Sequence, residues 1–220
     1  GYNPTIRDRL FNRIEARKRI LNEKIEEAKK EDQSLYEEWE KEVQLASNLL
    51  NGDLNAYKAV LVEEDLFTDI SELGSKVKFH IHSPDILEIV LFINAKTVIP
   101  WENKKLTKTG KVSSRKMAKT KYFSLHKDYA CSSVLRIARE IFSALPCKKV
   151  YIHARDSMIE DTNAQTEAGT IVSVEFTNEF IRSLNFAKID AQSAIESANH
   201  DMKFRKTKGF AFVEKIPINS

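Results

Sequence analysis

Three histidines have the type and spacing that chemistry at a metal ion would need. His80 and His82 are separated by one residue in an alternating segment, so both side chains point to one side of a predicted strand. His153 lies in a second alternating segment, and imidazoles that converge from neighbouring strands are typical zinc ligands. The flanking Lys76 and Lys78 disfavour a divalent cation, and the pattern equally fits a solvated basic strand face. We therefore predict no metal site.

A group of carboxylates offers a second kind of chemistry. Its members are Asp156, Glu160, Asp161 and Glu175. Carboxylates that converge near a strand end bind Mg²⁺ and position a water molecule for hydrolysis. Most of this group lies in a predicted turn, where acidic residues are common, and residues 175–177 lack the Glu-x-Lys pattern of many nucleases. A metal-dependent hydrolase or nuclease that uses the acidic turn at residues 156–161 and the histidines stays an alternative, and no residue is predicted to be catalytic.

The sequence lacks the motifs of the commoner enzyme classes. It contains no GxxxxGK[ST], GxGxxG, GxSxG or HExxH motif and no paired CxxC motifs. Nucleotide hydrolases, Rossmann-type oxidoreductases and zinc peptidases are therefore disfavoured, and we predict no cofactor. Cys131 and Cys147 are too isolated for a disulfide framework, so we expect buried free thiols in a reducing compartment, the cytoplasm.

A basic segment at residues 104–121 gives the strongest functional indication. The chain of 220 residues has 35 Lys and Arg against 32 Asp and Glu, yet these 18 residues hold eight cations and no acid. Cations on a flexible loop neutralise phosphates without reading base edges, so we predict nucleic-acid binding without strong sequence preference. The predicted contact residues are Lys104, Lys105, Lys108, Lys111, Arg115, Lys116, Lys119 and Lys121.

A second basic segment near the C-terminus has the same character. Its cations are Lys203, Arg205, Lys206 and Lys208. Tyr122 and Phe123 follow the first segment, and Phe204 and Phe210 flank the second, so we expect aromatic rings that stack on bases. The expected partner is DNA or RNA. An acidic protein bound by the same cations is the alternative, in which case the chain is a scaffold.

Residues 1–50 are predicted to form a long helical, coiled-coil-like segment. Positions 5–50 contain no Gly or Pro, and apolar residues recur at helical spacings. They are Leu10, Ile14, Leu21, Ile25, Ala28, Leu35, Trp39, Val43, Ala46 and Leu50. An unbroken helix of this length is a rod of about 68 Å, too long for one small domain to bury. We therefore expect a homo-oligomer formed through this helix, or a fold-back at a break near residues 31–34.

Residues 51–220 are predicted to form an α+β body. Period-two alternation predicts strands near 76–82, 86–93, 150–154 and 169–176, an edge strand near 97–101 and a final hairpin within 202–213. Helices are expected near 53–67 and 122–145, and as short segments capped by Thr177 and Asp190. The fold class is thus α+β: a largely antiparallel sheet built from hairpins and covered by helices, preceded by the long N-terminal helix. The basic segment is expected as a mobile loop at 104–121.

No membrane-spanning segment is predicted. The longest apolar run, residues 86–93, is eight residues long and contains Glu88, whereas a spanning helix needs about 20 residues. The N-terminus has no apolar run of the kind found in signal peptides. These features support the cytoplasm as the expected location.

One segment resembles a known group of proteins. Residues 133–146, SVLRIAREIFSALP, follow the basic stretch LTKTGK at 106–111, and together they resemble the C-terminal region of uncharacterised bacterial proteins of unknown function. The resemblance covers roughly the last two thirds of the chain and implies a bacterial, cytoplasmic origin. Because the chain starts with Gly1 rather than Met, we also expect a domain upstream. The resemblance implies no activity, so the leading interpretation is a non-enzymatic interaction module.

Overall fold

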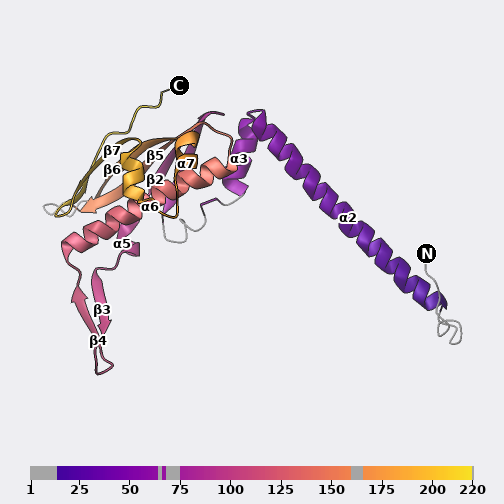
Figure 1. Ribbon diagram of the computed structural model, residues 1–220, viewed down its shortest axis with the longest axis horizontal. Coiled ribbons are helices and arrows are strands. Elements are labelled where there is room, and N and C mark those ends of the chain that lie inside the picture. Colours follow the sequence, from indigo (N-terminus) through magenta and orange to yellow (C-terminus); the bar gives the residue numbers. More distant parts are fainter. Residues whose placement is uncertain (1–13, 64–65, 68–74, 160–165, 220) are drawn as a thin grey trace. The chain divides into compact units, whose positions relative to one another are not determined.

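The computed structural model describes residues 14–63, 66–67, 75–159 and 166–219, which form two compact units divided after Asn51 (Figure 1). The first unit contains one long helix. The second contains a mixed, mostly antiparallel sheet with helices. The predicted α+β class is therefore confirmed. None of the described helices is long and apolar enough to cross a membrane.

Helix α2 runs without interruption from Ile14 to Leu50. The break expected at residues 31–34 is absent, because that stretch is polar but contains no Gly or Pro, the residues that break helices. Its side chains also support the helix, since Gln33 Nε2 donates to Glu37 Oε1 at 2.8 Å. The helix ends at the predicted Gly stop signal, where Gly52 adopts a φ of 76°.

The six-stranded sheet of the second unit has the order β1-β2-β5-β6-β7-β8. Its strands are β1 (Lys76–Ser83), β2 (Ile86–Phe92), β5 (Lys149–Ile159), β6 (Thr166–Thr177), β7 (Asn199–Arg205) and β8 (Gly209–Ala211). All neighbouring strands are antiparallel except β2 and β5, which are parallel. A parallel pair needs a long crossover connection, which includes helix α6 (Lys119–Ala144).

Helix α6 covers one face of the sheet (Figure 1). The strand residues on this face, among them Leu87, Ile152 and Val172, have no solvent exposure. The small Ala130 and Cys131 of α6 are equally buried, and small residues allow a helix to lie close to a sheet. Further helices complete the body: α3 (Leu54–Glu63), α5 (Ala95–Val98), α7 (Asn178–Ser183) and α8 (Ala191–Glu196).

The short helices α7 and α8 begin at the predicted caps. Thr177 Oγ1 accepts from the Phe180 amide at 3.2 Å, and Asp190 Oδ2 accepts from the Ser193 amide at 2.9 Å. The edge strand expected at residues 97–101 is wrong, because α5 occupies this region. Ala95 and Ile99 are both buried, so this segment ends in a packed turn and not in a sheet edge.

The C-terminal segment, residues 212–219, lies along the opposite face of the sheet as an extended chain. The Val213 amide donates to the Thr170 carbonyl at 2.9 Å, and the Ile216 amide donates to Ser173 Oγ at 2.9 Å. Farther along, the Asn219 amide donates to the Tyr151 hydroxyl at 3.4 Å. This segment is called the C-terminal strap below.

The basic segment is not the mobile loop that its composition predicted. It forms an antiparallel hairpin of β3 (Glu102–Leu106) and β4 (Val112–Lys116), which pairs with no other described strand. The register places Lys104 opposite Ser114 and Lys105 opposite Ser113, so no two cations face each other across the ladder. Like charges directly opposite are what destabilise such a pair.

The turn of this hairpin is closed by Thr107. Its amide and its Oγ1 both donate to the Lys111 carbonyl at 2.8 Å, and its Oγ1 accepts from the Lys111 amide at 3.0 Å. Gly110 supplies the left-handed conformation, with a φ of 77°. These local bonds explain why a highly charged segment is ordered as a hairpin.

Candidate nucleic-acid interface

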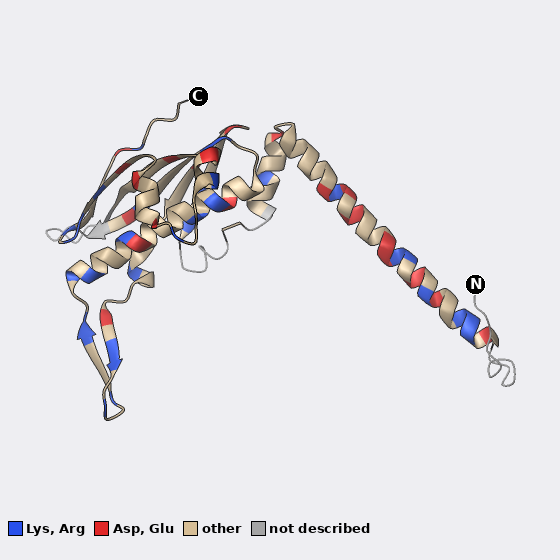
Figure 2. Ribbon diagram, in the orientation of Figure 1, with Lys and Arg blue, Asp and Glu red and all other residues tan. Residues whose placement is uncertain are grey.

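Residues 102–116, called the basic hairpin from here on, expose every cation that the sequence singled out there. Lys105 and Arg115 lie on one side of the ribbon, and Lys104 and Lys116 lie on the other. The blue residues of this ribbon are visible in Figure 2. Within the described part of the chain, no carboxylate forms an ion pair with any of the eight predicted cations between residues 104 and 121. These charges are therefore available to an anionic partner.

The root of the basic hairpin is held by an aromatic stack. The rings of Trp101 and Tyr122 lie 4.2 Å apart with an interplanar angle of 11°. The Met117 amide donates to the Trp101 carbonyl at 2.7 Å, and Lys121 Nζ lies 3.5 Å from Asn103 Oδ1. The hairpin is thus connected to the first turn of α6 through side chains as well as through the chain.

The stack changes which ring is free to contact a base. Tyr122 is buried beneath Trp101, so it does not offer the open ring face that its place after the basic segment predicts. Trp101 is 47% exposed and was not singled out. Its position immediately before the first basic strand was the available indication, because a basic groove with interleaved aromatic rings is typical of single-strand binding.

The second basic segment packs beside the same part of α6. Its cations lie on β7 and on the turn to β8, and all four are exposed. Gly209, at the end of this turn, approaches Phe123 so closely that an added Cβ would lie 2.8 Å from its ring. Lys127 Nζ lies 5.1 Å from the centre of the Phe204 ring.

The two basic segments therefore meet around the N-terminal turns of α6. Phe123, which contacts the β7–β8 turn, is also a neighbour of Tyr122, with ring centroids 5.9 Å apart. Figure 1 shows the basic hairpin and the β7–β8 turn at the same end of α6. We call the cations of residues 104–121 and 203–208, together with Trp101, the basic surface.

The histidines lie elsewhere, on the strap-covered face of the sheet. His82 Nε2 and His153 Nε2 lie 3.2 and 3.5 Å from the two oxygens of Glu88, and Lys215 of the strap donates to Glu88 Oε1 at 2.7 Å. His80 contacts only the ring of His82 within this group, with centroids 4.4 Å apart. No group of three or more potential ligands among the described residues is arranged to hold a metal ion.

The pKa values in this cluster follow from burial and from the strap. Burial lowers the pKa of His153 to about 4, and the positive charge of Lys215 acts in the same direction. Burial raises the pKa of Glu88, but hydrogen bonds from Lys215 and His82 outweigh it, so the net pKa lies below its usual value. Near neutral pH, His153 is therefore neutral and Glu88 is ionised.

The two predicted acidic residues that the structure describes, Asp156 and Glu175, do not come together in one site. Asp156 is buried with His126, and the two side chains approach to 2.8 Å. Glu175 contacts Lys149 at 3.2 Å and accepts from Asn199 at 3.0 Å. Glu160 and Asp161 lie outside the described residues.

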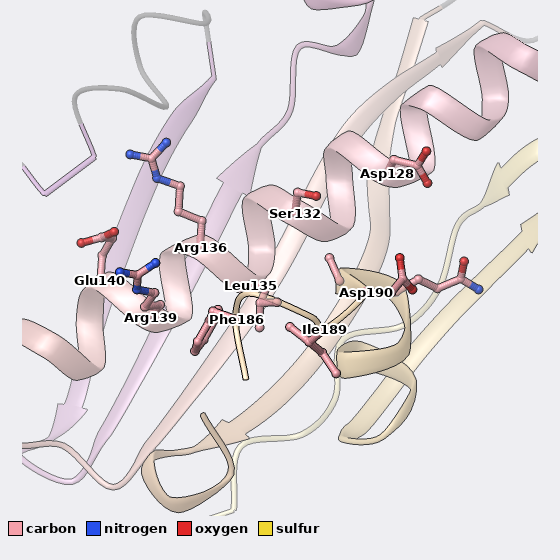
Figure 3. A pocket seen from close by; sticks show the side chains of 11 residues that line it. Asp128, Ser132, Leu135, Arg136, Arg139, Glu140, Phe186, Ile189 and Asp190 are labelled. Atoms are coloured by element: carbon pink, nitrogen blue, oxygen red, sulfur yellow. The ribbon is translucent and has the colours of Figure 1, made fainter. Parts of the chain in front are cut away.

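An open depression of about 580 Å³ lies between α6 and the segment that leads into α8 (Figure 3). Arg139 lies over the Phe186 ring at 5.3 Å. The lining mixes both signs of charge, with Asp128, Glu140 and Asp190 beside two arginines, and so favours neither an anionic nor a cationic ligand.

No protein-family model, no curated protein and no solved structure matches this chain. The fold and the site describe an α+β body that carries an exposed, basic two-stranded ribbon.

Proposed function

We propose that the protein is a non-enzymatic module that binds nucleic acid without strong sequence preference through its basic surface. The observation that carries this proposal is the basic hairpin, whose six cations are exposed and lack ion-pair partners within the described chain. A two-stranded ribbon is narrow enough to enter a nucleic-acid groove. Flexible lysines contact phosphates as point charges, which gives affinity without sequence discrimination.

The hairpin adds a constraint that a mobile loop would lack. Its strands fix Lys105 and Arg115 on one side and Lys104 and Lys116 on the other. The backbone that carries these cations therefore needs no ordering when a partner binds, and this lowers the entropic cost of association. The cations of β7 and the β7–β8 turn extend the positively charged surface along α6.

The test is a titration of labelled single-stranded and duplex DNA and RNA at two salt concentrations. Replacing Lys108, Lys111, Arg115 and Lys116 together with Ser is expected to weaken binding and to reduce the salt slope by up to about four. A control with the same loss of charge replaces Lys58, Lys148, Arg182 and Lys188, which are exposed and lie outside the basic surface. This control is expected to retain most of the affinity and slope.

Two results would overturn the proposal. Equal binding by the wild type and the hairpin variant would show that the hairpin is not the contact surface. No binding to any nucleic acid at low salt would leave an acidic protein as the partner of the same cations.

The cytoplasm is the proposed location of this activity. Cys131 and Cys147 are free and buried, as their isolated positions in the sequence predicted. Free thiols without a disulfide are typical of a reducing compartment.

A further inference from the structure

Helix α2 exposes an apolar stripe that its own unit does not bury. Ile25, Leu35 and Trp39 are 51%, 58% and 55% exposed, and no described residue of the helix is buried. The helix of 37 residues is about 55 Å long. Exposed apolar residues in a continuous stripe mark a surface that is covered in the functional state.

The stripe follows a seven-residue repeat with three charged positions. In this frame the seam consists of Ile14, Lys18, Leu21, Ile25, Ala28, Asp32, Leu35, Trp39, Glu42, Ala46 and Leu49. The charged members are Lys18, Asp32 and Glu42. Their signs decide which orientation of a second copy is favourable.

A parallel pair in register places each seam residue beside itself. Lys18, Asp32 and Glu42 would then form three like-charge contacts inside the seam, which is unfavourable. An antiparallel pair centred on residue 30 brings together residues whose numbers add up to 60. Lys18 then faces the partner's Glu42, and the two-fold axis repeats this contact at the other end.

The remaining seam positions also fit the antiparallel arrangement. Leu21 faces the partner's Trp39, and Ile25 faces the partner's Leu35, so apolar residues cover each other. Asp32 faces the small Ala28 of the partner subunit and no other acid. Among the described residues of the single chain, Lys18 forms an ion pair only with Glu15, at 3.2 Å. This pair is exposed and therefore weak, so little stability is lost when Lys18 turns to a partner's carboxylate.

The distribution of charge along the helix also favours the antiparallel arrangement. Residues 14–30 carry six basic and four acidic side chains, whereas residues 31–50 carry one basic and six acidic ones. The acidic part is the red region near the middle of α2 in Figure 2. An antiparallel pair places the basic half of one helix against the acidic half of the other.

We propose that α2 binds a second copy of this chain as an antiparallel two-stranded coiled coil centred on residue 30. This inference is independent of the nucleic-acid proposal. It would make the protein a dimer whose two bodies are attached at opposite ends of the coil.

A charge-reversal cycle in the 220-residue chain tests the orientation. Lys18→Glu and Glu42→Lys each turn two attractive contacts into two repulsive ones, so each is expected to raise the dimer Kd about tenfold. The double variant K18E/E42K restores the contacts and is expected to return the Kd to near the wild-type value. In a parallel pair, each reversal exchanges one like-charge contact for another, and no rescue occurs. Lys30→Glu, outside the seam, is the matched control and is expected to leave the Kd nearly unchanged.

A distance measurement gives an independent readout. Ala16 lies outside the seam, and a spin label at Ala16→Cys is expected to be about 42 Å along the axis from its copy in the antiparallel dimer. A parallel dimer would give no axial separation. Cys131 and Cys147 are buried, and burial raises the pKa of both thiols to about 12, so they do not compete for the label. A monomer by sedimentation, a short label distance or failure of the double reversal to restore the Kd would each overturn the proposal.

Discussion

The Nδ1 atom of His153 lies 2.8 Å from the hydroxyl oxygen of Ser173, and neither side chain is exposed to solvent. The Ile216 amide of the C-terminal strap donates to the same hydroxyl oxygen at 2.9 Å. The hydroxyl of Ser173 thus bridges the strap amide and the imidazole, because a serine oxygen has one proton to donate and two lone pairs to accept with. The two residues thus connect strands β5 and β6 to the strap.

The first prediction concerns pH. Because the pKa of folded His153 is lowered to about 4 from an unfolded value near 6.5, the unfolded chain binds more protons in this window. The contribution of His153 to stability is complete above pH 6.5 and is lost as the pH falls toward 4, by up to about 3 kcal/mol. Urea unfolding at pH 7, 6, 5 and 4 measures this loss. His153→Gln is expected to flatten the pH dependence of the unfolding free energy between pH 6.5 and 4. An unchanged profile would show that His153 is not its source.

The second prediction concerns the hydroxyl of Ser173. Ser173→Ala removes the hydroxyl that bonds the Ile216 amide and His153 Nδ1, which is expected to cost about 1–3 kcal/mol of unfolding free energy. Ser132 on α6 is exposed, and Ser132→Ala is the control, expected to change stability by less than about 0.5 kcal/mol. Equal unfolding midpoints in urea would show that the strap is not fastened through Ser173.

The sequence predicts which segments form helices and strands better than it predicts which segments pair or pack with one another. Helix α6 and the caps at Thr177 and Asp190 follow from local periodicity and short-range hydrogen bonds, and the structure confirms them. The parallel pairing of β2 and β5 depends on contacts about 60 residues apart and has no local pattern. The strap lacks any period, so its position over Ser173 was not predictable.

The basic surface shows the same division between local and long-range information. Composition alone indicates the cations. Their hairpin geometry depends on the hydrogen bonds of Thr107 and on a register that places Lys104 and Lys105 opposite serines. The burial of Tyr122 depends on Trp101 lying over it, 21 positions earlier in the chain. The density of charge in the sequence indicates where a binding surface lies, whereas only the tertiary fold specifies an aromatic stack such as that of Trp101 on Tyr122.

The third prediction separates backbone strain from steric overlap at two glycines. Gly110 and Gly209 have φ values of 77° and 80°, but nothing lies within 4 Å of an added Cβ at Gly110, whereas Phe123 is 2.8 Å away at Gly209. Gly110→Ala is expected to cost about 1 kcal/mol and to affect the hairpin turn only. Gly209→Ala is expected to cost more, because Phe123 must also move. Thermal unfolding of both variants measures the difference, and a larger loss for Gly110→Ala would contradict it.

The last prediction concerns Trp101 as a stacking platform. One ring face lies on Tyr122 and the side chain remains 47% exposed, so a nucleobase is expected to stack on the open face. Trp101→Leu is expected to weaken single-stranded DNA binding by about 1–3 kcal/mol, with a smaller effect on duplex DNA, whose bases are already stacked. Trp101→Phe keeps an aromatic face and is expected to retain most of the affinity. The chain has two tryptophans, so in a Trp39→Phe background the fluorescence of Trp101 alone reports the contact. Quenching by single-stranded DNA supports the platform, and unchanged fluorescence at saturation would show that the bases do not reach this ring.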